Sequence, residues 1–173
     1  LTKSSIRKHI WIVMQDNTLF NTTIKENMLI AKNDASEDDI INALKKAKAE
    51  FVFSSEKWLE TIIWERWLKL SWWEKQRINI ARIFLRNPEI LILDEATSAL
   101  DNKTEAEIQK SIEELLIWKT SIIIAHRLST IKKVDRIFVL DKGKIVESWN
   151  YEELIQKKWF FFALANPDKM ILN

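Results

Sequence analysis

The feature that most constrains the fold of this chain is a short, uninterrupted apolar run, Ile90-Leu91-Ile92-Leu93. Pro88 precedes the run and Asp94-Glu95 follow it. An apolar run of this length between such residues predicts a strand buried on both faces, which is typical of parallel sheets. A similar run, Ile122-Ile123-Ile124, predicts a second buried strand over residues 120–125.

Apolar residues at helical spacing separate and flank these strands. They predict four main helices: from Ser36 to about Glu50, over Trp72–Arg86, over Lys103–Ile117 and over about Glu152–Lys158. The remaining elements are an earlier strand, a short helical stretch and a hairpin, at Ile10–Met14, near Ile131 and at 136–140 with 144–147. Strands that alternate with helices predict an α/β fold with a largely parallel sheet and flanking helices.

Composition excludes several classes of protein. The chain has 173 residues, a formal net charge of +2 and no Cys. Its length fits one globular domain of ordinary size. The small net charge predicts no nucleic-acid partner, and the absence of Cys excludes disulfides and thiolate metal sites. No apolar run approaches the roughly 18 residues of a membrane-spanning helix, and no signal-peptide core follows the first residues.

The acidic pair Asp94-Glu95 lies where a strand of the predicted sheet ends. One interpretation is that these are ordinary polar residues at the point where a strand meets solvent. The other is a ligand site, because ligands of open α/β sheets bind beyond the carboxyl ends of the strands. Adjacent carboxylates there can divide the work, one orienting a magnesium ion and the other a water molecule.

The surrounding motifs favour the second interpretation. In chain order they are Gln15 after Ile12-Val13-Met14, Leu70-Ser71-Trp72-Trp73-Glu74, the strand ending in Asp94-Glu95, Ser98-Ala99-Leu100-Asp101, and His126. This order resembles the nucleotide-binding domain of ATP-binding cassette (ABC) transporters, with its Q-loop, its Leu-Ser-Gly-Gly-(Glu/Gln) signature, its Walker B strand, its D-loop and its switch histidine. The resemblance implies a P-loop NTPase-like fold. It also implies a helical subdomain over about residues 25–88, with the rest of the ATPase core in residues 1–24 and 89–173.

The resemblance implies ATP and Mg²⁺ as cofactors and gives roles to four residues near them. Asp94 would hold Mg²⁺ through water, and Gln15 would couple the metal site to the membrane part of the transporter. Glu95 would polarise the water that attacks the γ-phosphate, and His126 would contact that phosphate.

The signature and the D-loop imply a dimer. Ser71, followed by Trp72, Trp73 and Glu74, would touch the γ-phosphate of nucleotide held by a second nucleotide-binding domain, and Asp101 would link the two domains. The other implied partner is the transmembrane domain of the same transporter, which places the chain at the cytoplasmic face of the cell membrane.

Two further segments resemble exporters within this family. The segment Thr61-Ile62-Ile63-Trp64-Glu65-Arg66-Trp67 resembles the Thr-x-x-Gly-Glu-x-Gly segment that faces the coupling helices of exporters. The residues from His126 to Thr130 are similar to the exporter sequence as well. The alternative from another class is a soluble ABC-type ATPase that acts on DNA or ribosomes.

The P-loop motif G-x-x-x-x-G-K-[ST] is missing from the sequence. Trp118-Lys119-Thr120 resembles its end when Gly is substituted for Trp, but Glu113 occupies the first Gly position and the segment precedes a strand. In the family the P-loop lies upstream of the Q-loop. We therefore expect the chain to be the C-terminal portion of a longer protein and to be inactive in isolation.

Glycine usage is abnormal. Average usage predicts about 12 glycines in a chain of this length, whereas the sequence has one Gly and nine Trp. The resemblance places Gly at all nine Trp positions: 11, 58, 64, 67, 72, 73, 118, 149 and 159. The explanation we favour is that UGA codons meaning glycine in the host were translated as tryptophan. If the tryptophans are genuine, the indoles would block closure over ATP, and the chain would be a catalytically inactive interaction module.

Two structural signs are expected if the backbone was built for glycine. The residues at Trp118 and Trp149 lie beside turns where a positive φ is expected, a conformation that Gly adopts without penalty. The indoles should also be unusually exposed or crowded in loops.

The recoding hypothesis predicts that all nine Trp codons are UGA and that protein made in its native host carries Gly at these positions. Gene sequencing and peptide mass spectrometry of host-made protein measure both. Trp in the peptide from Leu70 to Lys75 would contradict recoding and favour the inactive module.

Overall fold

The computed structural model describes residues 2–14, 18–63, 70–94, 102–125 and 128–166. The chain forms two compact units, residues 1–124 and residues 125–173. The first unit is built on a three-stranded parallel sheet, and the second on a two-stranded antiparallel hairpin. Among the described residues, no helix combines the length and the hydrophobicity that a membrane span requires.

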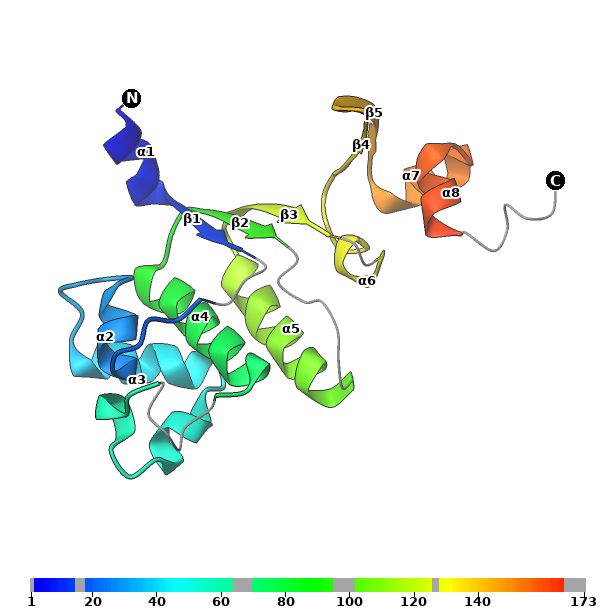
Figure 1. The fold of residues 1–173 in the computed structure, drawn as a ribbon. Coiled ribbons are helices and arrows are strands. Elements are labelled where there is room, and N and C mark those ends of the chain that lie inside the picture. Colours follow the sequence, from blue (N-terminus) through cyan, green and yellow to red (C-terminus); the bar gives the residue numbers. More distant parts are fainter. Residues whose placement is uncertain (1, 15–17, 64–69, 95–101, 126–127, 167–173) are drawn as a thin grey trace. The chain divides into compact units, whose positions relative to one another are not determined.

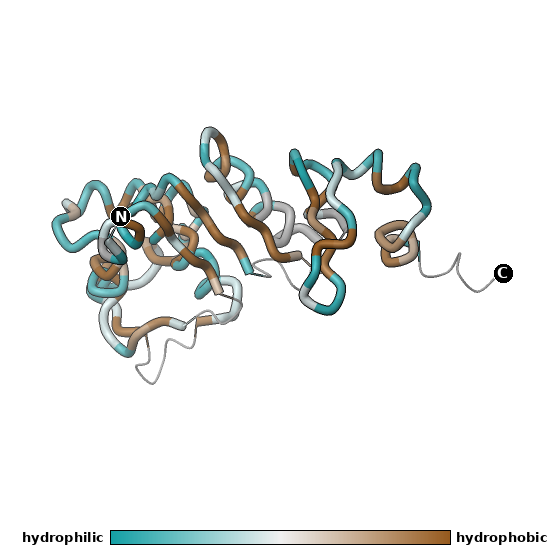
Figure 2. The backbone as a smooth tube through the Cα atoms, turned by 90° about the horizontal axis from the view of Figure 1, so that it is seen from above, coloured by the Kyte–Doolittle hydropathy of each residue, from teal (hydrophilic) through white to brown (hydrophobic). Residues whose placement is uncertain are grey.

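The sheet of the first unit confirms the predicted α/β class. Its strands are β1 (Ile10–Val13), β2 (Ile90–Asp94) and β3 (Thr120–Ile124), in the order β1-β2-β3. All neighbours are parallel, so the carboxyl ends of the three strands meet at one edge. Figure 2 shows these strands as adjacent hydrophobic segments.

Burial on the two faces of the sheet is unequal, which corrects one prediction. Leu91 and Leu93 are buried in the core shared with the helices α4 (Trp72–Arg86) and α5 (Asn102–Leu116), which lie on one side of the sheet (Figure 1). The opposite face leaves about half of each of Ile12, Ile122 and Ile124 exposed. The prediction of strands buried on both faces was wrong here because, within the described part of this unit, helices cover one face only.

The helices on this side of the sheet agree closely with the sequence pattern. The α4 helix has the predicted bounds: Ser71 caps its start, and Asn87 ends it in the left-handed conformation with φ +50° before Pro88. The α5 helix lies within one residue of its predicted bounds. Of its predicted apolar stripe it buries Ile108, Ile112 and Leu115 and leaves Leu116 half-buried.

The third predicted helix of this unit begins correctly and ends early. The α3 helix (Glu37–Lys46) starts after the Ser36 cap, but Lys48 has φ +56°, and the chain continues as the 3₁₀ helix η1 (Glu50–Ser54). A left-handed residue cannot continue an α-helix.

The short helices were not predicted. They are α1 (Lys3–His9), α2 (Ile24–Leu29), the 3₁₀ helix η2 (Trp58–Glu60) and α8 (Phe160–Ala165). Each has too few turns for an apolar stripe to repeat. Only α1 and α2 have a side-chain cap, which for α2 is the capping box formed by Thr23 and Glu26.

The second unit contains the predicted hairpin. Its strands β4 (Ile137–Asp141) and β5 (Lys144–Trp149) are antiparallel, and Lys142 and Gly143 of the turn have φ +48° and +76°. Two central residues with positive φ match a type I′ turn. The helices α6 (Leu128–Ile131), α7 (Tyr151–Lys157) and α8 complete the unit, and Ile137, Val139, Leu154 and Phe161 form its core.

Two described tryptophans have backbone conformations that favour glycine. Trp118 has φ +63° and its residue is 99% exposed, as expected for a position built for Gly. Trp58 has φ +47° and is also exposed, although the sequence did not single it out. The prediction for Trp149 was wrong, because this residue ends β5 and its φ is not positive.

Replacing Trp118 with Gly should raise the free energy of unfolding by about 0.5–1 kcal/mol. Relief of the left-handed conformation contributes about 1–2 kcal/mol, and the larger entropy of Gly in the unfolded chain offsets about 0.4–1 kcal/mol of it. Chemical denaturation of the Trp118→Gly variant measures the difference.

Trp149→Gly is the matched control. It should lower the free energy of unfolding by at least about 0.5 kcal/mol, because Gly weakens a strand and because the Lys157 ammonium lies 3.6 Å from the Trp149 ring centroid. A loss of stability in both variants would contradict the strain at Trp118.

Candidate functional site

The first part of the candidate site is the N-terminus of α4, where Ser71 and Glu74 form a capping box. The Ser71 N–H donates to Glu74 Oε2 at 2.7 Å, and the Glu74 N–H donates to Ser71 Oγ at 3.3 Å. The Ser71 hydroxyl also donates to Glu74 Oε2 at 2.8 Å. The Ser-x-x-Glu spacing is the sequence signature of this cap, which holds the Ser71 hydroxyl at the start of the helix.

Trp72 and Trp73 occupy the first turn of α4. Their rings meet edge to face at a centroid distance of 4.6 Å, both residues are half-buried, and Trp73 packs against the core. The first N–H groups of a helix have no partner inside it and lie at the positive end of its dipole, so this turn attracts anions. The two indoles therefore crowd the helix end where a phosphate would bind.

The second part is the carboxyl edge of the parallel sheet. Asp94, which is half-buried, ends β2 beside Ile124, the last residue of β3. Val13, the last residue of β1, pairs with Leu93. Since the three strands end in register, the segments that follow them begin at the same edge.

Four predicted site residues lie outside the described residues: Gln15, Glu95, Asp101 and His126. Three of them directly follow the strands of the sheet, with Gln15 two residues after β1, Glu95 one residue after β2 and His126 two residues after β3. The side-chain hydrogen bonds found for Ser71 go to Glu74 of α4 and not to Asp94. These bonds therefore do not bring the two predicted site residues together.

A magnesium ion fits the donor at this edge. The described residues contain no cluster of three His, Cys, Asp or Glu side chains that could enclose a metal ion. Mg²⁺ bound with a nucleotide needs only one or two carboxylates, because phosphate oxygens and water complete its coordination. Asp94, at the carboxyl end of a strand, is a donor of this kind.

Sequence reasoning missed a buried polar pair, Arg82 on α4 and Asn27 on α2. Both residues are buried, and desolvation lowers the pKa of Arg82 to about 10. Arg82 Nη2 donates to Asn27 Oδ1 at 2.6 Å. The signal available in the sequence was the place of Arg82 between Ala81 and Ile83 on the core-facing side of a predicted helix.

Comparison with known proteins gives a consistent set of relatives. A family model described as ABC transporter matches residues 1–98. The ABC transporter ATP-binding protein YwjA of Bacillus subtilis (strain 168) is 50% identical over 157 residues, which cover 90% of this chain and 27% of that protein. A protein of Staphylococcus aureus (strain NCTC 8325 / PS 47), named as a multidrug export ATP-binding/permease protein, is 47% identical over 155 residues. These residues cover 89% of this chain and 27% of that protein.

A solved structure of a bacterial Atm1-family ABC exporter with ATP bound is also similar. Its TM-score is 0.86 at 39% sequence identity, and the match covers 97% of this chain and 30% of that one. The chain therefore spans about a quarter of the length of the curated relatives it matches.

The capping box predicts the effect of Ser71→Ala on stability. Loss of the cap should lower the free energy of unfolding by about 1 kcal/mol, because the Glu74 N–H loses its acceptor. Ser36→Ala is the matched control, since Ser36 and Asp39 form the same box on α3 with both hydrogen bonds at 3.1 Å. Equilibrium denaturation should give similar losses, and an unchanged Ser71→Ala variant would contradict the cap.

Proposed function

This chain belongs to the ABC transporter family, and we propose that it forms part of the ATP-binding and ATP-hydrolysing domain of an exporter. The domain would use ATP to drive transport across a membrane. In this proposal residues 25–88 form the helical subdomain, and residues 1–24 and 89–173 contribute to the ATPase core. The P-loop belongs to the part of the longer protein that this chain does not span.

The observation that carries the proposal is the common edge at which β1, β2 and β3 end. Val13 pairs with Leu93, and Asp94 pairs with Ile124. Gln15, Glu95 and His126 follow these strand ends within two residues. The register therefore supports a single site at this edge, built from three segments that are far apart in the sequence.

Within this site each residue has a distinct task. Asp94 and Gln15 would hold Mg²⁺, with Asp94 acting through water, and Gln15 would also couple this metal site to the transmembrane domain. When bound with ATP, the ion would supply charge neutralisation. Glu95 orients and polarises the attacking water, and His126 donates a hydrogen bond to the γ-phosphate.

The N-terminus of α4 acts on the nucleotide of a second domain. Ser71 contacts its γ-phosphate by turning its hydroxyl proton from Glu74 Oε2 to that phosphate, and the first turn at positions 72 and 73 offers N–H groups to the same anion. Glu74 keeps Ser71 in place through the capping box. Asp101 links the two domains, which form a two-fold dimer.

We propose that positions 72 and 73 carry glycine in the working protein, as do the other seven tryptophan positions. The positive φ values of Trp58 and Trp118 support this, because both residues occupy a conformation that favours glycine. The crowding of the first turn of α4 by two indoles supports it as well. Genuine tryptophans would leave the inactive interaction module as the function.

The exporter assignment depends on the Thr61–Trp67 segment and on the names of the relatives. The partner is the transmembrane domain of the same transporter, and the domain lies at the cytoplasmic face of the membrane. The relatives named above are transport proteins, so they give no support to an ATPase that acts on DNA or ribosomes.

Glu95→Gln in the full-length protein should leave ATP binding intact and lower the hydrolysis rate at least about 100-fold, because the amide cannot polarise water as a base. Nucleotide binding and steady-state phosphate release measure the two effects separately.

Glu89→Gln is the matched control, since Glu89 precedes the amino end of the same strand and is exposed. It should hydrolyse ATP at the unsubstituted rate. A Glu95→Gln variant with unchanged hydrolysis would remove Glu95 as the base and make His126 the leading candidate.

A further inference from the structure

Arg82 connects α4, the helix that begins with the signature residues, to the segment that follows the predicted Q-loop residue Gln15. Its Nε donates to Asn27 O at 2.8 Å, and its Nη2 donates to Asn27 Oδ1 at 2.6 Å. Its Nη1 donates to Thr18 O at 3.3 Å and to Asn79 Oδ1 at 2.8 Å. All four acceptors are neutral oxygens. The directions of these hydrogen bonds, and not an ion pair with one of these partners, therefore fix the planar guanidinium group of Arg82.

Asn27 in turn holds the segment of residues 18–25, which we call the clamp segment. The Asn27 side chain is fully buried, and its Nδ2 donates to Phe20 O, Thr22 Oγ1 and Thr23 O, each at 3.0 Å. Its Oδ1 accepts from the Phe20 N–H at 2.9 Å. One side chain therefore fixes the backbone that follows residues 15–17.

The clamp segment is also joined to the beginning of the segment of residues 61–67, which we call the exporter-like segment. The Ile24 N–H donates to Thr61 O at 3.0 Å, and the Ile63 N–H donates to Thr22 O at 3.1 Å. These bonds flank an antiparallel bridge between Thr23 and Ile62.

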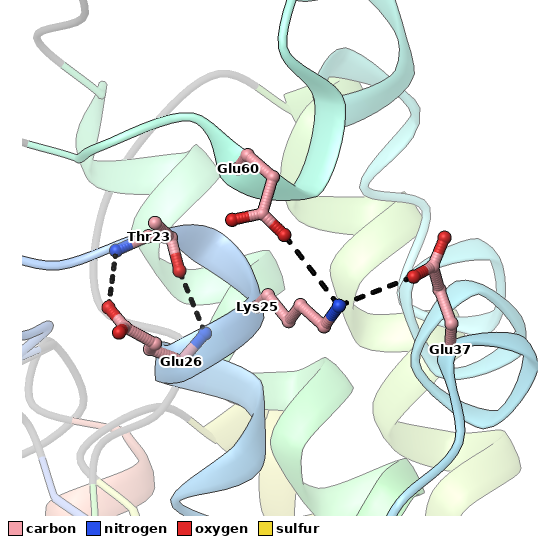
Figure 3. A network of polar contacts seen from close by, with 5 residues as sticks. All are labelled: Thr23, Lys25, Glu26, Glu37 and Glu60. Carbon is pink, nitrogen blue, oxygen red and sulfur yellow. Dashed lines mark hydrogen bonds and ion pairs between the residues drawn. The ribbon is translucent and has the colours of Figure 1, made fainter.

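A charged contact on the surface accompanies this bridge. Lys25 Nζ lies 3.4 Å from Glu37 Oε2 on α3 and 3.6 Å from Glu60 Oε1 on η2 (Figure 3). The clamp segment therefore contacts elements on both sides, α3 and the residues around Thr61, in addition to α4.

A purely structural role would not require a buried cation. Burying a charge is costly, and an apolar pair of similar volume often gives equal or greater stability. A bidentate guanidinium contact instead specifies one orientation of the two elements that it joins. Arg82 lies on the same helix as Ser71. Its contact with Asn27 therefore fixes the orientation of α4 relative to the clamp segment.

We propose that Arg82 and Asn27 are a positioning pair that makes α4, the clamp segment and the start of the exporter-like segment move as one body. Ser71 and the segment containing Gln15 would then reach the two nucleotides of the dimer together. The inference rests on the proposed function and adds two positioning residues that do not contact nucleotide themselves.

The test compares Arg82→Lys with Arg86→Lys in the full-length protein made in its native host. Lysine keeps the charge but lacks the fork that reaches both oxygens of Asn27. Arg86 lies on the same helix and donates to Ala31 O at 3.0 Å and to Arg7 O at 3.2 Å, outside the clamp segment. The readouts are kcat, the Kd for ATP, and amide hydrogen exchange of residues 18–25.

Arg82→Lys should lower kcat at least about tenfold through misplacement of the site, with the Kd for ATP changed by less than about twofold. Exchange in the clamp segment should accelerate. Arg86→Lys should retain kcat. An Arg82→Lys variant with unchanged kcat, or an equal loss of kcat in both variants, would overturn the inference.

If Arg82→Lys does not accumulate as folded protein, Asn27→Asp provides the same test. Aspartate keeps the acceptors for Arg82 but loses the Nδ2 amide group, whose two hydrogens are shared among Phe20 O, Thr22 Oγ1 and Thr23 O. Its kcat should fall at an unchanged Kd for ATP, and a retained kcat would overturn the inference. An unsubstituted protein without Glu95-dependent hydrolysis would overturn the proposed function as well, whereas retained kcat in a hydrolysing protein would overturn the inference alone.

Discussion

The first unit depends on the burial of α4 along its length. Ile78, Ile80, Ala81 and Ile83 are almost completely buried in the same core as the strands of the sheet. Each buried isoleucine contributes about 1.5–3 kcal/mol through removal of apolar area from water. This burial makes α4 a rigid support, so a residue at its N-terminus and a residue along its side keep a fixed relation to each other. The candidate functions of Ser71 and Arg82 both depend on that rigidity.

The register of the parallel sheet is the second constraint. A parallel pair brings equivalent strand ends to one edge, and the pairings of Val13 with Leu93 and of Asp94 with Ile124 leave little offset between the three ends. The strand ends Val13, Asp94 and Ile124 therefore lie at one edge of the sheet. This arrangement is the basis of the proposed site, whose residues are scattered in sequence, and the isoleucines of the opposite face stay about half exposed.

Two of the tryptophans occupy backbone conformations that favour glycine. Trp118 and Trp58 have positive φ, where a side chain is strained, and Trp118 gains no burial in return. Trp73 is different, because its ring packs against the core. The physical case for glycine is therefore strongest at the exposed turns and at the first turn of α4, where the proposed phosphate contact would need access to N–H groups. At Trp149 the conformation makes no such demand, since the residue continues a strand.

The sequence by itself determined the elements whose signal is local and repeated. The apolar runs predicted β2 and β3, the helical stripes predicted α4 and α5, and the runs at residues 136–140 and 144–147 predicted the hairpin. The chain order of the motifs around Ser71 and Asp94 was enough to identify the family. Only the tertiary structure decided that one face of the sheet is half-exposed, because burial depends on which layers cover a strand and not on the strand itself. The same holds for the contact between Arg82 and Asn27, since 55 residues separate the two partners and a hydrogen bond between distant segments has no periodic signature in the sequence.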